Sequence, residues 1–246
     1  MLRPGLAPCA YQNSTGQTSI SATRRFHIYS PLDFTILKPA NDFDRIAPYY
    51  DHLAGLVFGK SILESQLCHL SMVAPGSRIL ILGGGTGQIL PYLLAKDPVG
   101  ITYLEPSIRM SEKAMLRVPS GEPVDFVRGS FEDLPDDEVY DALITPFVLD
   151  LFTTSELSEC MNKLSSVLSP QGRWLFSDFQ ICDPPKRYWQ APFIHLMYRF
   201  FRLACNIRAN RLPNFEKNFR SYRLVETKAT SFFGGAIISR VYRFRD

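Results

Sequence analysis

The stretch RILILGGGTGQIL, residues 78–90, decides the fold of this 246-residue chain. A short, continuous apolar run leads directly into closely spaced glycines, a threonine and a second apolar turn. An apolar run without alternation predicts a strand that is buried on both faces of a parallel sheet. Glycines without a Cβ let the backbone turn tightly and come close to a ligand. We therefore expect a strand over 78–82, a ligand-binding loop and a helix from Thr86 or Gly87 to about Lys96.

The same alternation of strand and helix continues along the chain. Strands are predicted over 100–105, 124–129, 140–148 and 173–179, and helices over 107–118 and 154–168, the last capped by Thr154 or Ser155. Such alternation is typical of parallel strands with right-handed crossovers. Two helices divided at Pro48 precede the first strand, and "PQG" (170–172) predicts a turn.

The C-terminal part of the chain follows a different pattern. An aromatic helix over about 189–206 is followed by two strand-like segments that Gly234-Gly235 joins, which predicts an antiparallel hairpin. The predicted fold is α/β: a doubly wound, seven-stranded, mostly parallel sheet with a C-terminal antiparallel hairpin.

Charge and cysteine usage restrict the function. The five cysteines are scattered without a C-x-x-C pair, so we expect neither a disulfide framework nor a metal site. The net charge is +3, but residues 186–246 carry 13 Lys and Arg against three acids. This basic quarter suits an anionic partner or a membrane surface, and a solvated face is the alternative. No apolar run reaches membrane-spanning length.

The glycine loop excludes two common ligands. A P-loop needs Lys and Ser or Thr after its last glycine, whereas Gly87 is followed by Gln88 and Ile89. The dinucleotide fingerprint G-x-G-x-x-G fails because Gln88 occupies its third glycine position. The loop instead reads G-x-G-x-G, at Gly83, Gly85 and Gly87.

With this loop, residues 43–180 resemble a class I S-adenosylmethionine-dependent methyltransferase. The chain is most similar to the group that includes the ubiquinone/menaquinone-biosynthesis C-methyltransferases. Five segments carry the resemblance: FDRIAPYYD (43–51), the glycine loop, YLEPS (103–107), GSFEDLP (129–135) and LSPQGRWLFSDF (168–179). The resemblance implies a Rossmann-like fold, S-adenosylmethionine as the cofactor and methyl transfer as the activity.

The resemblance also implies which residues hold the cofactor. The glycine loop would approach its methionine part and sugar, and Glu105 would accept hydrogen bonds from both ribose hydroxyls. The expected cofactor-binding residues are Tyr50, Gly83, Gly84, Gly85, Gly87, Glu105, Pro106, Ser130, Phe131 and Thr145. One departure is Ile81, which stands where the family usually has Asp or Glu. The cofactor's ammonium group is then left to backbone carbonyls near Gly83 or to another side chain.

Three residues are candidates for catalysis if the acceptor must lose a proton. Asp150 and Asp178 follow predicted strands, and His195 lies in the aromatic helix that would cover the cleft. Each has a structural alternative, because Asp150 can cap a helix, Asp178 can bind backbone amides and His195 can be packed.

The expected acceptor is a small, largely apolar organic molecule, such as an aromatic or isoprenoid-like compound. We expect the protein to bind no nucleic acid and to have no obligate protein partner. A non-catalytic cofactor-binding protein and an RNA methyltransferase are the alternatives. The motif of adenine-N6 enzymes is missing, since the site after the fourth strand reads Thr145-Pro146-Phe147-Val148. Peripheral membrane contact through the basic quarter is a further expectation.

We expect one methyltransferase domain over 42–246. It comprises lid helices (42–74), a cofactor-binding core (78–180) and the aromatic, basic helix with the hairpin (186–246). Residues 1–41 are expected to be a tail, rich in Ser, Thr, Pro and Gly and without an acid before Asp33. The sequence leaves open whether its first 30 residues are a transit peptide, a disordered tail or a start-site artefact. We expect a cytoplasmic protein, or an organellar one if a transit peptide is present.

Overall fold

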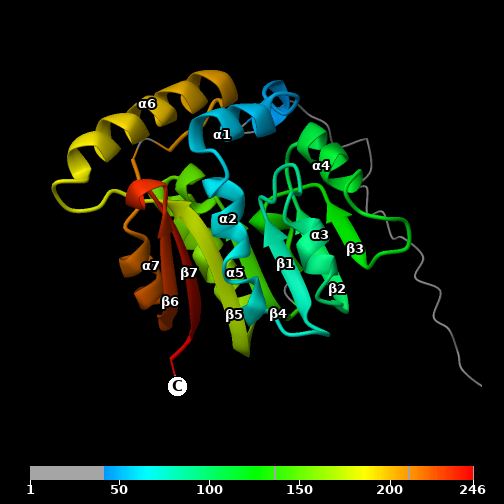
Figure 1. The fold of residues 1–246 in the computed structure, drawn as a ribbon. Helices are drawn as coiled ribbons and strands as arrows, with labels where there is room; N and C mark the ends of the chain where they lie inside the picture. Colours follow the sequence, from blue (N-terminus) through cyan, green and yellow to red (C-terminus); the bar gives the residue numbers. More distant parts are fainter. Residues whose placement is uncertain (1–41, 136, 210, 246) are drawn as a thin grey trace, which may run out of the picture.

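Seven strands form one sheet in the order β3-β2-β1-β4-β5-β7-β6 (Figure 1). The computed structural model describes residues 42–135, 137–209 and 211–245, so the predicted tail over 1–41 lies outside the described residues. The strands are β1 Arg78–Leu82, β2 Gly100–Leu104, β3 Val124–Val127, β4 Tyr140–Pro146, β5 Leu168–Phe179, β6 Leu224–Phe232 and β7 Ile237–Phe244. Six strands share one direction, and β7 pairs antiparallel with both β5 and β6. The predicted doubly wound sheet with its C-terminal hairpin is confirmed.

Helices cover both faces of the sheet and one of its ends (Figure 1). On one face lie α2 Ser61–Leu67, η3 Leu70–Met72, α3 Leu90–Leu94 and α4 Ile108–Met115, and on the other lie α5 Thr154–Val167 and α7 Phe215–Ser221. Above the carboxyl ends of the parallel strands lie η2 Phe43–Arg45, α1 Tyr50–Phe58 and α6 Arg187–Cys205. The short helices η4 Phe131–Asp133, η5 Leu149–Leu151 and η6 Phe233–Gly235 complete the fold. In the described part of the chain, no helix combines the length and apolarity that crossing a membrane requires.

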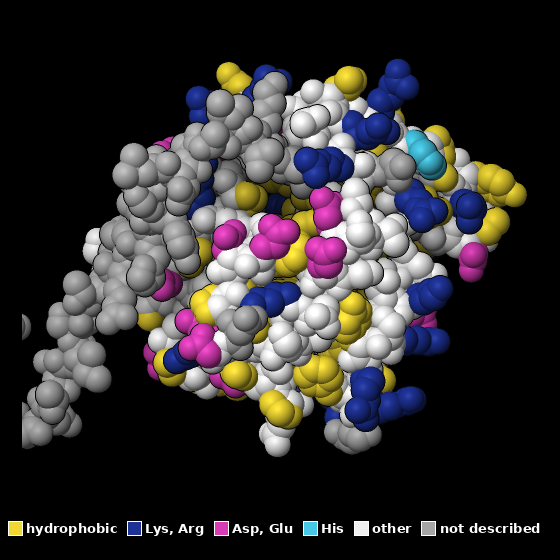
Figure 2. Space-filling model, turned by 180° about the vertical axis from the view of Figure 1, so that it is seen from behind, with side chains coloured by type: hydrophobic (Ala, Val, Ile, Leu, Met, Phe, Trp, Pro, Cys, Tyr) yellow, Lys and Arg dark blue, Asp and Glu magenta, His cyan; other side chains and the backbone are white. Residues whose placement is uncertain are grey.

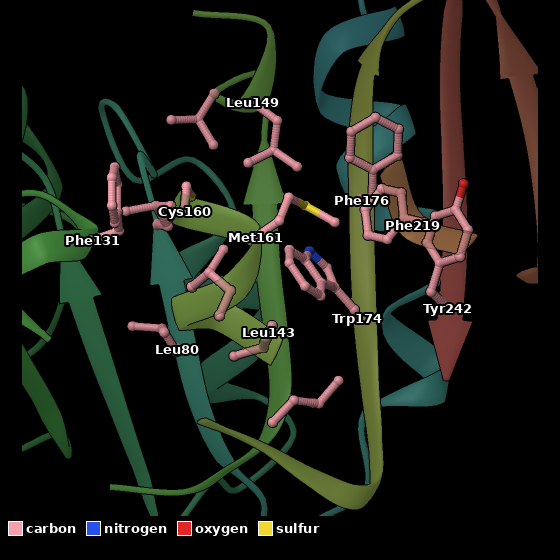
Figure 3. Packing of buried hydrophobic residues seen from close by; sticks show 14 of the residues in the cluster. Leu80, Phe131, Leu143, Leu149, Cys160, Met161, Trp174, Phe176, Phe219 and Tyr242 are labelled. Carbon is pink, nitrogen blue, oxygen red and sulfur yellow. The ribbon is translucent and has the colours of Figure 1, made fainter. Parts of the chain in front are cut away.

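The apolar run of β1 is continuous because each face of the sheet meets its own core. Leu80 and Leu82 belong to the cluster under α5 and α7, which also contains Trp174 and the stacked rings of Phe219 and Tyr242, 3.8 Å apart (Figure 3). Ile79 and Ile81 point to the opposite cluster, under α3 and α4. Alternate side chains of a strand point to opposite faces, so both faces of β1 are dry.

Several local predictions need correction. The helix after the glycine loop begins only at Leu90, because Gly87 has a φ of +74° and continues the loop. The cap of α5 is Thr153, whose hydroxyl accepts from the amide of Glu156 while the Glu156 carboxylate accepts from the amide of Thr153. This reciprocal pair satisfies two amides that the predicted caps would have left unpaired.

Two further segments differ from the sequence-based prediction. The "PQG" segment lies within β5, where the pairing with β4 shifts register, so it bulges instead of ending the strand. The hairpin connection consists of η6 and Ala236, not of two glycines alone. The helix α7 was not predicted.

Candidate active site

The three alternate glycines of the loop after β1 serve different purposes. All three have a positive φ: 68° at Gly83, 61° at Gly85 and 74° at Gly87. A Cβ added to Gly83 would lie 2.5 Å from Val148, and one added to Gly87 would lie 2.6 Å from Ala114. A Cβ on Gly85 would meet no atom within 4 Å. Gly83 and Gly87 therefore permit close packing, whereas Gly85 presents bare backbone to open space.

Tyr103 in β2 supports the loop from behind. Its ring fills the space that a Cβ on Gly84 would need, and its hydroxyl donates to the carbonyl oxygen of Gly85 at 2.7 Å. Tyr103 is fully buried. The loop is thus held in its shape from the core side.

Glu105, directly after β2, lies next to the open space above Gly85. Its side chain is 5% exposed, and its two carboxylate oxygens accept from the amides of Gly85 and Ser107, each at 3.0 Å. Burial raises the pKa of Glu105 to about 7, although both backbone hydrogen bonds act in the opposite direction. A carboxylate can accept about four hydrogen bonds. Glu105 therefore retains acceptor capacity for two further donors.

The N-terminal segment is fastened to this loop by two acidic side chains. Asp44 accepts from the Ser107 hydroxyl at 2.5 Å and from the amide of Arg109 at 3.1 Å. Asp51 accepts from the Thr86 hydroxyl at 2.7 Å and pairs with Arg117 at 2.9 Å. These contacts, which sequence reasoning did not find, hold η2 and α1 over the cofactor side of the sheet.

Tyr50 is the first residue of α1 and lies within electrostatic reach of both Glu105 and Asp150. Burial raises the pKa of its hydroxyl, and the negative charges of Asp150, Asp51 and Glu105 raise it further. The ring of Tyr50 meets Phe43 edge-on, with 6.4 Å between the ring centroids. The structure therefore places Tyr50 under the influence of carboxylates from both β2 and β4.

Asp150 and Asp178 form a buried acid pair at the ends of β4 and β5. Asp178 is fully buried, and its carboxylate accepts from the amides of Asp150 at 3.3 Å and Phe179 at 2.7 Å. Asp150 is 2% exposed, and its Oδ2 accepts from the Tyr198 hydroxyl at 2.8 Å. Its Oδ1 has no hydrogen-bond partner among the described residues.

Burial raises the proton affinity of both acids. It raises the pKa of Asp150 to about 6, with the Tyr198 hydrogen bond acting against the rise. It also raises the pKa of Asp178 well above its ordinary value, and the negative charge of Asp150 adds to that rise. The two carboxyl groups therefore oppose each other's ionisation, and the Tyr198 hydrogen bond favours the charged form of Asp150. Tyr198, which sequence reasoning missed, fixes the orientation of that charged group.

An apolar wall adjoins the acid pair. The ring of Phe179 lies 5.0 Å from that of Phe147 and 5.3 Å from that of Phe58, which in turn meets Phe193 of α6. Phe147 has a φ of +54°, a conformation that costs energy in a residue with a Cβ and is typical of sites under functional constraint. Seen from behind, the molecule is hollowed below its upper edge, with apolar side chains inside and acidic ones at the rim (Figure 2).

Two sequence-predicted residues do not join this arrangement. His195 is exposed on α6, and its Nδ1 lies 2.6 Å from the Ala191 carbonyl oxygen, so the geometry gives a catalytic role no support. The hydroxyl of Thr145, 1% exposed, accepts from the indole of Trp174 at 2.9 Å, inside the core. It is therefore not free to contact a cofactor.

The remaining predicted residues follow β2 and β3 in the chain. Pro106 is exposed beside Glu105, and Ser130 caps η4 through a hydrogen bond with the amide of Glu132. Phe131 is 5% exposed and packs edge-on against Phe152. Ile81 is fully buried in the core, so its side chain cannot contact a ligand at the strand end.

These residues fit S-adenosylmethionine. Open space lies above the bare backbone of Gly85, beside a buried carboxylate with acceptor capacity for two hydroxyls. This combination suits a ligand that carries a ribose.

Comparisons with known proteins agree with the geometry. A family described as "Methyltransferase domain" matches residues 79–172. The ubiquinone/menaquinone biosynthesis C-methyltransferase UbiE of Vibrio vulnificus is 28% identical over 182 residues, which cover 70% of this chain and 69% of the relative. The UbiE protein of Pseudomonas fluorescens is 29% identical over 150 residues, or 58% of each chain.

Solved structures show the same fold at low identity. A putative methyltransferase in complex with the Haloferax volcanii Trm112 methyltransferase activator has a TM-score of 0.63 at 15% identity. The match covers 85% of this chain and all of that one. The Burkholderia thailandensis 1,6-didemethyltoxoflavin-N1-methyltransferase, solved with bound 1,6-didemethyltoxoflavin and S-adenosylhomocysteine, has a TM-score of 0.59 at 15% identity. It matches over 82% of this chain and 85% of its own.

The glycine loop, the acid after β2, the sheet order and these relatives lead to one assignment. The chain is a class I S-adenosylmethionine-dependent methyltransferase, similar to the ubiquinone/menaquinone biosynthesis C-methyltransferases.

Proposed function

We propose that this enzyme methylates a small, largely apolar organic acceptor beneath α1 and α6. The observation that carries the proposal is a buried carboxylate with a free oxygen, Asp150 Oδ1, beside an aromatic wall at the strand ends. The names of the curated relatives, which act in quinone biosynthesis, support an acceptor of this class.

The cofactor-binding roles follow from the glycine loop. The backbone at Gly85 would lie against the cofactor, Glu105 would accept from the two ribose hydroxyls, and Tyr50 would close the methionine end. S-adenosylmethionine supplies the reaction with an electrophilic methyl group on its sulfonium. What the chain must add is alignment of the acceptor, which can lower the barrier by about 7–11 kcal/mol.

Asp150 would orient the acceptor and take its proton. Its pKa of about 6 leaves it charged near neutral pH yet still basic enough to receive a proton. The Tyr198 hydroxyl holds one oxygen, so the other is left for the acceptor. Asp178 holds the backbone of Asp150 by accepting from its amide, and burial raises the pKa of Asp178, which disfavours a second negative charge in the site.

The aromatic wall would select the acceptor and exclude water. Phe147, Phe179 and Phe58 form an apolar surface with one charged group beside it. Apolar pockets with a small number of polar groups are typical of sites for organic ligands. A ring or an isoprenoid-like chain bearing one acidic group would match this surface.

The direct test is to find where the methyl group goes. Purified protein and cofactor with a labelled methyl group are incubated with organic-solvent, RNA and protein fractions of cells that carry the gene. We expect label in the organic-solvent fraction, and a loss of about 100-fold or more in the Asp150→Asn variant. Label transferred to RNA would overturn the acceptor class, and the RNA alternative would replace it.

A further inference from the structure

We propose that the outer face of α1 and α6, here called the roof, docks on an anionic membrane surface. Nine of the 14 exposed large apolar side chains among the described residues lie within 49–57 and 188–203. The most exposed of these nine are Leu56 at 84%, Leu203 at 79%, Tyr188 at 77% and Leu196 at 68%. Docking through the roof does not depend on which acceptor is methylated.

The apolar side chains of α6 form one stripe. Trp189, Leu196, Phe200 and Leu203 are exposed and fall within about 60° of one another around a helix of 3.6 residues per turn. Ile194, Tyr198 and Cys205 lie on the opposite side and are buried against the sheet end. The helix therefore has two apolar faces, of which the fold uses one.

α1 continues the same surface. Phe58 of α1 packs against Phe193 of α6, with 5.8 Å between the ring centroids, so the helices are neighbours (Figure 1). Leu53, Leu56 and Val57 of α1 are exposed. An exposed apolar surface formed by two adjacent helices marks an interaction site.

The charge on α6 has one sign. Residues 187–205 contain Arg187, Arg199 and Arg202 and no acid. Arg199 is exposed beside the stripe, and Arg202 is exposed further around the helix, about 100° from the nearest residue of the stripe. No carboxylate of the described residues forms an ion pair with either arginine. The acids Asp44 of η2 and Asp51 of α1 are bonded to residues of the sheet side. Asp44 bonds to Ser107, and Asp51 bonds to Thr86 and Arg117.

This combination selects a lipid surface as the occupant. An apolar stripe with flanking arginines is the pattern of helices that lie in the membrane interface beside anionic headgroups. A second copy of the chain on the same face would form a two-fold contact that brings arginines towards arginines. A bilayer instead offers an apolar layer beneath negative charge, which matches both features.

The test uses the full chain and vesicles of phosphatidylcholine with about one third phosphatidylserine. We expect the protein to sediment with these vesicles and not with pure phosphatidylcholine. Leu196→Asp and Arg199→Glu/Arg202→Glu should each lower the vesicle partition coefficient by more than about tenfold. Matched controls are Leu116→Asp, at an exposed position next to α4, and Lys217→Glu, on α7 in the same basic quarter.

Several results would overturn the proposal. They are wild-type protein that stays in the supernatant, roof variants that sediment like wild type, and control variants that lose binding equally. A dimer in solution that Leu196→Asp dissolves would assign the roof to a second copy instead. Binding of S-adenosylhomocysteine, measured on every variant, shows that the fold is intact. A lost methyl transfer with intact vesicle binding would contradict the proposed acceptor and leave the roof proposal standing.

Discussion

Replacing Glu105 by Gln should change stability and cofactor binding in opposite ways. The carboxyl group is 5% exposed, and burial raises its pKa from 4.5 to about 7. The folded protein therefore holds a proton between these pH values that the unfolded chain releases. Where the folded state binds more protons, the free energy of unfolding falls as pH rises.

The magnitude follows from the same pKa values. The full interval corresponds to about 3 kcal/mol, most of which is lost between about pH 5 and about pH 8. The side-chain amide of the Glu105→Gln variant does not titrate, so the variant escapes this loss. The difference in unfolding free energy, Glu105→Gln minus wild type, should therefore rise by about 2–3 kcal/mol over that range. Other titrating groups, Asp150 and Asp178 among them, cancel in the difference.

Urea denaturation of both proteins at the two pH values measures this double difference. Any constant cost of the amide, which offers one acceptor oxygen to two backbone amides, drops out. Calorimetry with S-adenosylhomocysteine should show affinity reduced by more than about tenfold, since hydrogen bonds to charged groups contribute about 1.5–3 kcal/mol each. A stability difference that is independent of pH would refute the buried, proton-binding Glu105, and unchanged affinity would refute its role at the ribose.

Three further substitutions separate binding, chemistry and closure. Gly85→Ala should lower S-adenosylhomocysteine affinity by more than about tenfold, as measured by calorimetry. It should also lower the unfolding free energy by about 1–2 kcal/mol, because φ is 61° at this position. Asp150→Asn should lower the turnover rate about 100-fold with the Kd for S-adenosylhomocysteine unchanged, and a weakened Kd would instead place Asp150 at the cofactor. Thr86→Val removes the hydrogen bond to Asp51, so KM for the cofactor should rise severalfold and the unfolding free energy should fall by about 1 kcal/mol. Unchanged kinetics would show that α1 does not control access to the cofactor site.

The sequence predicted the structure correctly where the pattern of a segment's own residues determines its secondary structure. The bounds of β1 match the prediction because its continuous apolar run needs burial on both faces, and both clusters supply it. The helix α7 was not predicted, because a seven-residue segment with only Phe215 and Phe219 as buried apolar residues shows little helical periodicity in its hydrophobic residues. Those rings are buried by stacking on β5 and β7, which only the folded sheet provides.

The site was predictable where its residues follow strands. The positions of Gly85, Glu105 and Asp150 after β1, β2 and β4 agree with the prediction, because parallel strands end at one edge of the sheet. The bonds of Asp44 and Asp51 to the region of α4 join residues more than 60 positions apart, so no sequence spacing reveals them. On α6, both faces are apolar, and the pattern could not tell which one looks inward.

Negative and positive charges lie on opposite sides of the roof helices. The carboxyl groups of Glu105 and Asp150 lie beneath α1 and α6 and are nearly buried, whereas the arginines of α6 are exposed on its outer side. The net charge of +3 conceals this separation. Salt screens exposed charges over about 10 Å or less at about 0.1 M and above, but affects buried groups little. Raising salt from about 0.1 M to about 0.5 M should therefore release the protein from anionic vesicles while leaving the Kd for S-adenosylmethionine within about twofold. Sedimentation and calorimetry on one preparation measure both, and a cofactor affinity that falls in parallel with vesicle binding would show that the inner carboxylates are open to solvent.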